Sequence, residues 1–318
     1  MTHPRFGWMN TRRMRRCASA AALSLLAGAC GPRADAEEVA DVDTPGAEGD
    51  WACRIVTPEV TLGSPVAEAS GASLDRRTPG VFWTHGDSGN PPVLFALGRN
   101  GELLGRVSVA GARNRDWEDM AIGPCPGGTC VYVADIGNNN ARQMDLVLYR
   151  APVPSAGDAA TAPAEAFRAR FPGAGRDAEG VFVMPQGEIY LVTKGASGPV
   201  ELWRWPTPLR ADTVQPLERV RELAPRVQAL GDLVTGAGAS QDGRWVALRT
   251  YGRLAIYRAA DLLGTGGPAY TMDLAPLGEA FGEAVAMESD GTLLLVSEGR
   301  GTTTGSRAAW LQCALPET

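Results

Sequence analysis

Short apolar runs separated by Gly, Pro, Asn and Asp fill the chain from Trp51 onward, a pattern typical of β-strands joined by turns. The clearest unit begins with the acidic segment 115–119, continues through two apolar strands, and ends in the polar segment 135–138. Similar units begin at Asp177 and at Phe281. Because self-similarity at a regular period indicates a repeat architecture, this pattern governs the fold prediction.

Aligning the repeats gives five units at a period of about 50 residues, each with short strands as in a β-propeller blade. The first strands begin near Ser70, Glu118, Glu179, Thr235 and Glu283. The fifth unit lacks a fourth strand, whereas segment 52–57 is a strand without a unit. We therefore predict an all-β fold, a single propeller of five four-stranded blades whose ring closes by pairing the N-terminal strand with the C-terminal blade. A sixth, degenerate blade within 151–176 or 206–232 is the alternative.

Four cysteines follow the first thirty residues, and an even number is typical of a protein that folds in an oxidising compartment. Cys125 and Cys130 flank Pro-Gly-Gly-Thr, a turn that would place them across a hairpin, so we pair them and leave Cys53 with Cys313. The second pair would lie on the two strands that close the ring, and closure removes exposed sheet edges. A zinc site is the competing interpretation, but the cysteine spacings do not suit one and histidine is nearly absent.

The first 29 residues have the features of an export signal. Arginines at positions 12, 13, 15 and 16 precede a short apolar segment, 18–27. The segment Leu26-Ala-Gly-Ala-Cys30 resembles the lipobox of bacterial lipoproteins, which implies that Cys30 becomes the lipidated first residue of the mature chain. A plain secretory signal cut near Ala29 is the alternative.

Residues 30–50 are acidic, small and poor in aromatic side chains, so we expect a disordered tether there and the propeller domain over 51–318. These features predict an exported protein of the cell envelope, attached by lipid to the periplasmic side of a membrane or to the cell surface. The membrane is thus one expected partner. An unknown small molecule or protein is another, and we expect a monomer.

Net charge changes this picture little. The chain carries a net charge of −6 with a pI of about 5.2, which gives no basic surface for nucleic acid. Positive charge comes almost entirely from arginine, because Lys194 is the only lysine.

The repeats also predict where polar side chains converge. In a propeller blade the first strand lines the channel and the second runs antiparallel to it, so the start of one lies beside the end of the other at the same channel mouth. Clustered carboxylates repel unless they are neutralised, and oxygen-rich clusters suit a hard cation such as calcium. The predicted calcium ligands are Glu118, Asp135, Asn138, Glu179 and Glu283. The predicted ligand-binding residues are Asp116, Asp177, Lys194, Arg249 and Glu298. In the alternative interpretation these acids cap turns and pair with arginines.

His85 is the only histidine beyond the signal segment, and the alignment places it at the same mouth. A histidine beside carboxylates can act as a general base near neutral pH, so His85 is the catalytic candidate. The alternative is an ordinary hydrogen-bonding group in a loop.

Asp177-Ala-Glu-Gly, followed by segments 188–195 and 200–205, resembles blades of phytase-like β-propellers. That resemblance implies Asp-x-Glu-Gly loops that hold calcium and substrate phosphate at the channel mouth, with Asp177 and Glu179 matching most directly and Asp116 and Glu118 next. More broadly, the pattern is similar to the superfamily of calcium-dependent propellers that includes lactonases and strictosidine-synthase-like proteins. Ser70 and Thr235 replace the acid in two units, and the lysine-rich phosphate pocket expected of a phytase has little counterpart.

Together these patterns predict an exported, lipid-anchored propeller that binds a cation and a small ligand at an acidic channel mouth. Two alternatives remain open at this point. One is a calcium-dependent hydrolase, either a phosphoesterase or a lactonase, in which the cation polarises the substrate. The other is a scaffold that binds proteins through its rim.

Overall fold

The structure is a computed structural model that describes residues 52–63, 66, 68–299 and 305–316. The predicted signal peptide (1–29), its lipidation site Cys30 and the predicted tether (30–50) lie outside the described residues. The described residues belong to one compact unit. Within that unit, the search for a helix with the length and apolarity needed to span a membrane found none.

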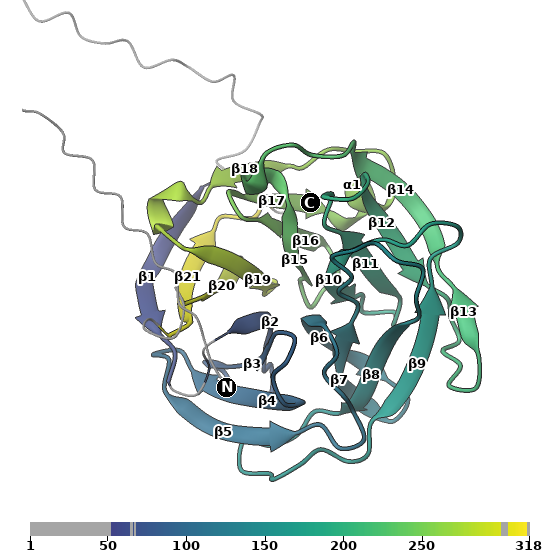
Figure 1. Cartoon of the computed structure of the whole chain (residues 1–318). Coiled ribbons are helices and arrows are strands. Elements are labelled where there is room, and N and C mark those ends of the chain that lie inside the picture. The colour runs from purple at the N-terminus through teal and green to yellow at the C-terminus, as the bar shows by residue number, and fades with distance from the viewer. Residues whose placement is uncertain (1–51, 64–65, 67, 300–304, 317–318) are drawn as a thin grey trace, which may run out of the picture. The chain divides into compact units, whose positions relative to one another are not determined.

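Five antiparallel sheets surround a common centre, so the chain forms the predicted five-bladed β-propeller (Figure 1). In the first four blades the strands follow sequence order from the centre outward. The first blade contains β2 (Ala69–Leu74), β3 (Val81–Gly86), β4 (Val93–Gly98) and β5 (Leu103–Ser108). The second contains β6 (Trp117–Cys125), β7 (Gly128–Asp135), β8 (Leu146–Pro152) and β9 (Glu165–Arg170).

The next two blades repeat this order. The third contains β10 (Ala178–Val183), β11 (Ile189–Thr193), β12 (Val200–Trp205) and β14 (Glu218–Ala224). The fourth contains β15 (Val234–Ala239), β16 (Trp245–Thr250), β17 (Arg253–Arg258) and β18 (Tyr270–Asp273). The short strand β13 (Val214–Pro216) was not predicted, and it pairs in parallel with β9 at the edge of the second blade. The short helices are η1 (Leu230–Asp232), α1 (Ala259–Leu263) and η2 (Ala275–Leu277).

The fifth blade closes the ring. It consists of β19 (Phe281–Met287), β20 (Thr292–Glu298), β21 (Arg307–Cys313) and, as its outer strand, β1 (Cys53–Thr61). Strand β1 pairs antiparallel with β21, which confirms the predicted closure between distant parts of the chain.

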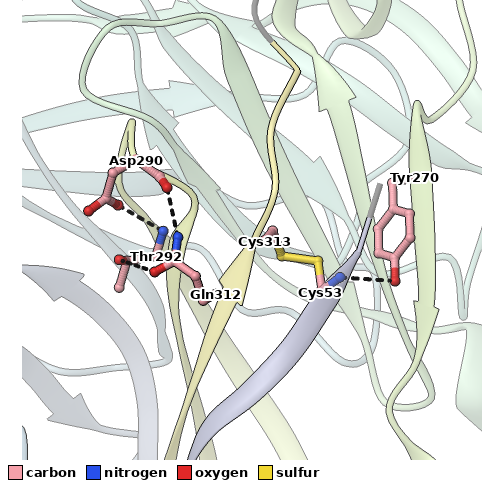
Figure 2. Close-up of a disulfide and its surroundings, with 6 residues drawn as sticks. All are labelled: Cys53, Tyr270, Asp290, Thr292, Gln312 and Cys313. Atoms are coloured by element: carbon pink, nitrogen blue, oxygen red, sulfur yellow. Dashed lines mark hydrogen bonds between the residues drawn. A yellow bond between two sulfur atoms is a disulfide. The ribbon is translucent and has the colours of Figure 1, made fainter. Parts of the chain in front are cut away.

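Both predicted disulfides are present. Cys53 lies opposite Cys313 in the β1–β21 register, and the two are bonded (Figure 2). The backbone N–H of Cys53 also donates to the Tyr270 hydroxyl of the neighbouring blade at 3.4 Å. Cys125 is bonded to Cys130 across the β6–β7 hairpin. Two disulfides are typical of a protein that folds outside the cytoplasm.

The five-blade count follows from where the two ambiguous segments lie. Segment 151–176 contributes the end of β8 and all of β9, and segment 206–232 contributes β13 and β14. Both segments complete the second and third blades, so the alternative of a sixth blade is not realised.

The core lies between neighbouring blades. Each inner strand contacts the inner strands of both adjacent blades, so both of its faces are buried. This explains why strands such as β10 are apolar without alternation, because every residue of β10 is buried. Four tryptophans fill the layers between the blades and are fully buried: Trp83, Trp117, Trp205 and Trp245.

Candidate cation and ligand site at the channel mouth

A β-bulge recurs at the same place in the inner strand of every blade. The antiparallel register slips once in each of β2, β6, β10, β15 and β19, one or two residues after the strand begins. A bulge adds one residue to one strand and re-aims its side chain, and bulges are frequent next to functional sites. The bulged residues are Ser70, Glu118, Glu179, Thr235 and Glu283, the same positions that the sequence repeat aligned.

A pocket of about 170 Å³ lies at this end of the channel. All five blades contribute to its lining, from a bulge, from the end of a second strand or the loop after it, and, for Phe281, from the start of an inner strand. The lining side chains are Ser70, Asp87, Glu118, Asn139, Glu179, Lys194, Tyr251, Phe281, Glu283 and Glu298. The repeat thus brings together residues that are up to 228 positions apart in the chain (298 minus 70).

Glu118 is the centre of the acidic cluster. Its carboxylate belongs to two groups whose oxygens all lie within 4.8 Å of one another, Asp87–Asp116–Glu118 and Glu118–Asp177–Glu179. The side chain is only 8 % exposed, yet its carboxylate makes no hydrogen bond or ion pair with any residue that the structure describes. The residue lines the pocket and its carboxylate has no protein partner, so this oxygen pair is the strongest candidate for a cation ligand.

The electrostatics of the cluster agree with that assignment. Burial, followed by repulsion from Glu179 and Asp87, raises the pKa of Glu118 well above its usual range. Burial also raises the pKa of Asp116 and of Asp177. Each of these shifts means that the folded protein disfavours the ionised form, and a bound cation would reverse that preference.

On the opposite side of the pocket, Glu283 and Glu298 have pKa values raised to about 7. Burial is the main cause for both carboxyl groups, and repulsion from Glu283 adds to the rise at Glu298. Both groups therefore titrate near neutral pH.

Lys194 supplies the pocket's positive charge. It directly follows β11, and its Nζ donates to Glu179 Oε1 at 2.8 Å. Burial works against the ammonium charge, but the ion pair with Glu179 raises the pKa of Lys194 overall. Glu179 is thereby neutralised within the protein, whereas Glu118 is not.

Asp135 and Asn138 shape the loop beside the cluster and do not line the pocket. The Asp135 carboxylate accepts the backbone N–H of Asp116 at 3.1 Å and forms an ion pair with Arg115 at 3.0 Å. The Asn138 side chain donates to the carbonyl of Arg142 at 2.7 Å, and its backbone N–H donates to Asp177 Oδ1 at 2.7 Å. Their oxygens are engaged in holding the loop, so we place them outside the ligand set.

Four other predicted site residues are absent from the pocket lining: Asp116 and Asp177, which belong to the acidic groups around Glu118, and Arg249 and His85. The Arg249 guanidinium is fully buried, donates to the carbonyls of Ala284 and Val296 at 2.9 and 3.0 Å, and forms an ion pair with Glu279. It joins the fourth blade to the fifth, so its predicted position in the ligand site is corrected.

His85 is likewise fully buried, with its ring 5.4 Å from that of Trp117 in an edge-to-face arrangement. Its Nδ1 lies 3.1 Å from the carbonyl of Gly86, and burial lowers its pKa to about 4. The predicted place of this imidazole at the open mouth is corrected, because the ring is buried against Trp117 of the second blade's inner strand and does not line the pocket.

Beneath the pocket, two charged side chains cross-link the inner strands. Asp119 is fully buried, and its carboxylate accepts backbone N–H groups of Met120, Val181 and Ala237 at 2.8–3.2 Å, which joins three blades. Burial raises the pKa of Asp119, and these N–H donors oppose that rise. At the far end, Arg76 donates to carbonyls of three inner strands and pairs with Glu288.

Sequence reasoning missed Tyr251 and Phe281, the aromatic side of the pocket. The register shows that Tyr251 corresponds to Lys194 of the third blade, and that Phe281 corresponds to Asp177. The repeat alignment could have identified both positions, but their residue types did not match an acidic pattern.

Comparison with known proteins shows the fold alone. No family model matches the chain, and no curated protein matches it. Among solved structures, the PQQ-bound form of an aldose sugar dehydrogenase from Streptomyces coelicolor is similar, with 13 % sequence identity and a TM-score of 0.50. The similarity covers 83 % of this chain and 98 % of that one.

Proposed function

We propose that the channel mouth binds a divalent cation, calcium, and through it a small ligand. The observation that carries the proposal is the buried Glu118 carboxylate, shared by two acidic groups and without a protein partner among the described residues. Glu118, Asp116, Asp87 and Asp177 are the ligands we assign. Flexible carboxylate oxygens from several loops suit calcium better than magnesium, which demands near-ideal octahedral geometry.

Charge limits the class of ligand. The acids that line the pocket carry five negative charges when ionised, against one positive charge on Lys194. One calcium ion leaves the pocket negative, so an anionic ligand such as a phosphate monoester is disfavoured. Neutral or cationic ligands fit this potential, which argues against the phosphoesterase alternative.

A calcium-dependent hydrolase of neutral esters or lactones is the second candidate. Glu283 lines the pocket with a pKa of about 7, a value that suits a general base near neutral pH. Calcium would polarise the carbonyl oxygen in such a reaction. Hydrolysis of a lactone panel by the wild type, lost in the Glu283→Gln variant, would support this activity.

We also infer that Cys30 anchors the protein to a membrane by lipid. Strand β1 begins at Cys53, at the opposite end of the fifth blade from Glu298 and the pocket. The chain therefore enters the propeller on the face away from the mouth, which would leave the mouth accessible. Loss of radiolabelled palmitate from a Cys30→Ser variant tests the anchor.

Calcium titration tests the main proposal. The protein is first treated with EDTA to remove bound metal. Adding calcium at about 100 times its Kd should then stabilise the fold by about 2.7 kcal/mol, which is measured as a rise in Tm. Glu118→Gln should remove most of that rise, whereas Glu102→Gln, an exposed acid on the rim, should leave it intact. A Tm that calcium does not change would refute the cation site.

A further inference from the structure

We propose that the aromatic side of the mouth is a subsite for a small organic ammonium ion, recognised by Phe281, Tyr251, Glu298 and Glu283. The proposal deepens the proposed function, because it names the class of ligand that the same pocket takes. It stands on three observations: an exposed aromatic ring beside a carboxylate, the charge of the pocket, and a buried acid without a partner.

The first observation is a cross-strand pair. Phe281 and Glu298 lie directly opposite each other in the β19–β20 register, so their side chains project from the same face of the blade. Phe281 is 45 % exposed, although most large apolar side chains of the described residues are buried. Its ring stands edge-to-face to Tyr251, with the centroids 6.1 Å apart. An exposed ring and a carboxylate are thus held side by side.

The second observation is that, among the described residues, no cation forms an ion pair with the two carboxylates on this side of the pocket. The Lys194 ammonium forms an ion pair with Glu179, and the buried Arg249 guanidinium of the fourth blade forms one with Glu279. The structure describes no ion pair for Glu283 or Glu298 within residues 52–63, 66, 68–299 and 305–316. A positively charged ligand would supply the missing charge.

The third observation is Glu118 on the inner wall of the same pocket. The residue is about nine-tenths buried, and its carboxylate has no partner among the described side chains. The pocket therefore combines a carboxylate that is free to bind a ligand, from Glu118, with an exposed aromatic surface, from Phe281 and Tyr251. Aromatic faces attract ammonium groups, and the attraction increases when the cation is removed from water.

A matched pair of probes separates charge from shape. Choline and 3,3-dimethylbutan-1-ol have nearly the same shape, but only choline carries a positive charge. In calorimetric titrations of the full chain, we expect choline to bind at least ten times more tightly than the alcohol. Equal binding of the two probes, or binding of inorganic phosphate in preference to choline, would overturn the proposal.

Two variants locate the subsite. Phe281→Leu keeps an apolar side chain but removes the aromatic face, and it should weaken choline binding about 5-fold. Leu104→Ala changes a similarly exposed apolar residue on the outer strand β5 and should leave choline binding unchanged. Because Phe281 is exposed, its replacement should not unfold the blade, and the Tm of each variant checks this. Unchanged choline binding by Phe281→Leu would place the ligand elsewhere and refute the subsite.

The same titrations distinguish this proposal from the calcium site. They are run on EDTA-treated protein and on calcium-loaded protein. Choline binding without any calcium-induced rise in Tm would support the ammonium subsite and refute the cation site. A calcium-induced rise in Tm without choline binding would support the cation site and refute the ammonium subsite.

Discussion

Ring closure by the Cys53–Cys313 disulfide should contribute more to stability than the second disulfide of the same chain. The bond joins residues 260 positions apart, whereas Cys125–Cys130 spans only 5 positions. A cross-link stabilises the fold mainly by removing conformations from the unfolded chain, and this effect grows with loop length. With that relation, the long loop gives about 5.6 kcal/mol and the short loop about 2.1 kcal/mol at 25 °C.

The assay is urea unfolding of two double variants, Cys53→Ser with Cys313→Ser and Cys125→Ser with Cys130→Ser. Each replaces both sulfur atoms of one disulfide, and each disulfide lies between neighbouring antiparallel strands, so the second variant is a matched control. We expect the first variant to lose about 3.5 kcal/mol more of the free energy of unfolding than the second. The hydrogen bonds beside Cys313, from Gln312 and Thr292, remain in both (Figure 2).

Equal losses from the two double variants would refute the reasoning. That outcome would mean that the ring opens between β1 and β21 in the folded variant, or that the two ends of the chain stay close in the unfolded state without the covalent bond. Limited proteolysis distinguishes these two explanations, because cleavage within β1 before any other strand indicates an opened ring in the folded protein.

Three further predictions concern the mouth and the channel beneath it. A Cβ at Gly137 would overlap Glu118 Oε1, so Gly137→Ala should weaken calcium binding at least 10-fold in a calorimetric titration, whereas Gly157→Ala, which has open space around it, should not. The pKa of Glu283 is about 7 in the folded protein and about 4.3 in the unfolded chain. Between about pH 4.3 and pH 7, the folded protein therefore binds a proton at Glu283 that the unfolded chain has released. Stability should therefore fall by up to about 3 kcal/mol as the pH rises from 4.5 to 7, and urea unfolding of Glu283→Gln should lack this component. Asp119→Ala should cost about 3 kcal/mol or more in the same assay, because N–H groups of three strands lose their acceptor; a loss below 1 kcal/mol would contradict the role we give this carboxylate.

The pocket also bears on how such a propeller can evolve ligand specificity. The bulge places a residue of four blades in the lining of the mouth, and these residues are Ser70, Glu118, Glu179 and Glu283. Three of the five bulged residues are glutamates, and the other two are Ser70 and Thr235. Substitution at the positions that line the pocket changes the chemistry of the mouth.

The amino-acid sequence by itself determined the fold, because its information is local and repeated. Apolar runs of strand length, separated by turn residues at a regular period, specify a blade wherever they occur. Closure was predicted from the strand 52–57, which belongs to no unit, and from the fifth unit, which lacks a fourth strand, and the pairing of Cys53 with Cys313 agreed with it. The convergence of Glu118, Glu179 and Glu283 followed from the same period.

Only the tertiary structure decided which polar residues are free to bind. Arg249 and His85 carry the residue types of a site, but contacts with other blades bury them, and those contacts join positions too distant to be read from a local pattern. Asp135 looked equivalent to Glu118 until its hydrogen bonds to the adjacent loop were known. Whether a carboxylate is free depends on the partners that surround it in three dimensions, and the sequence records its position but not those partners.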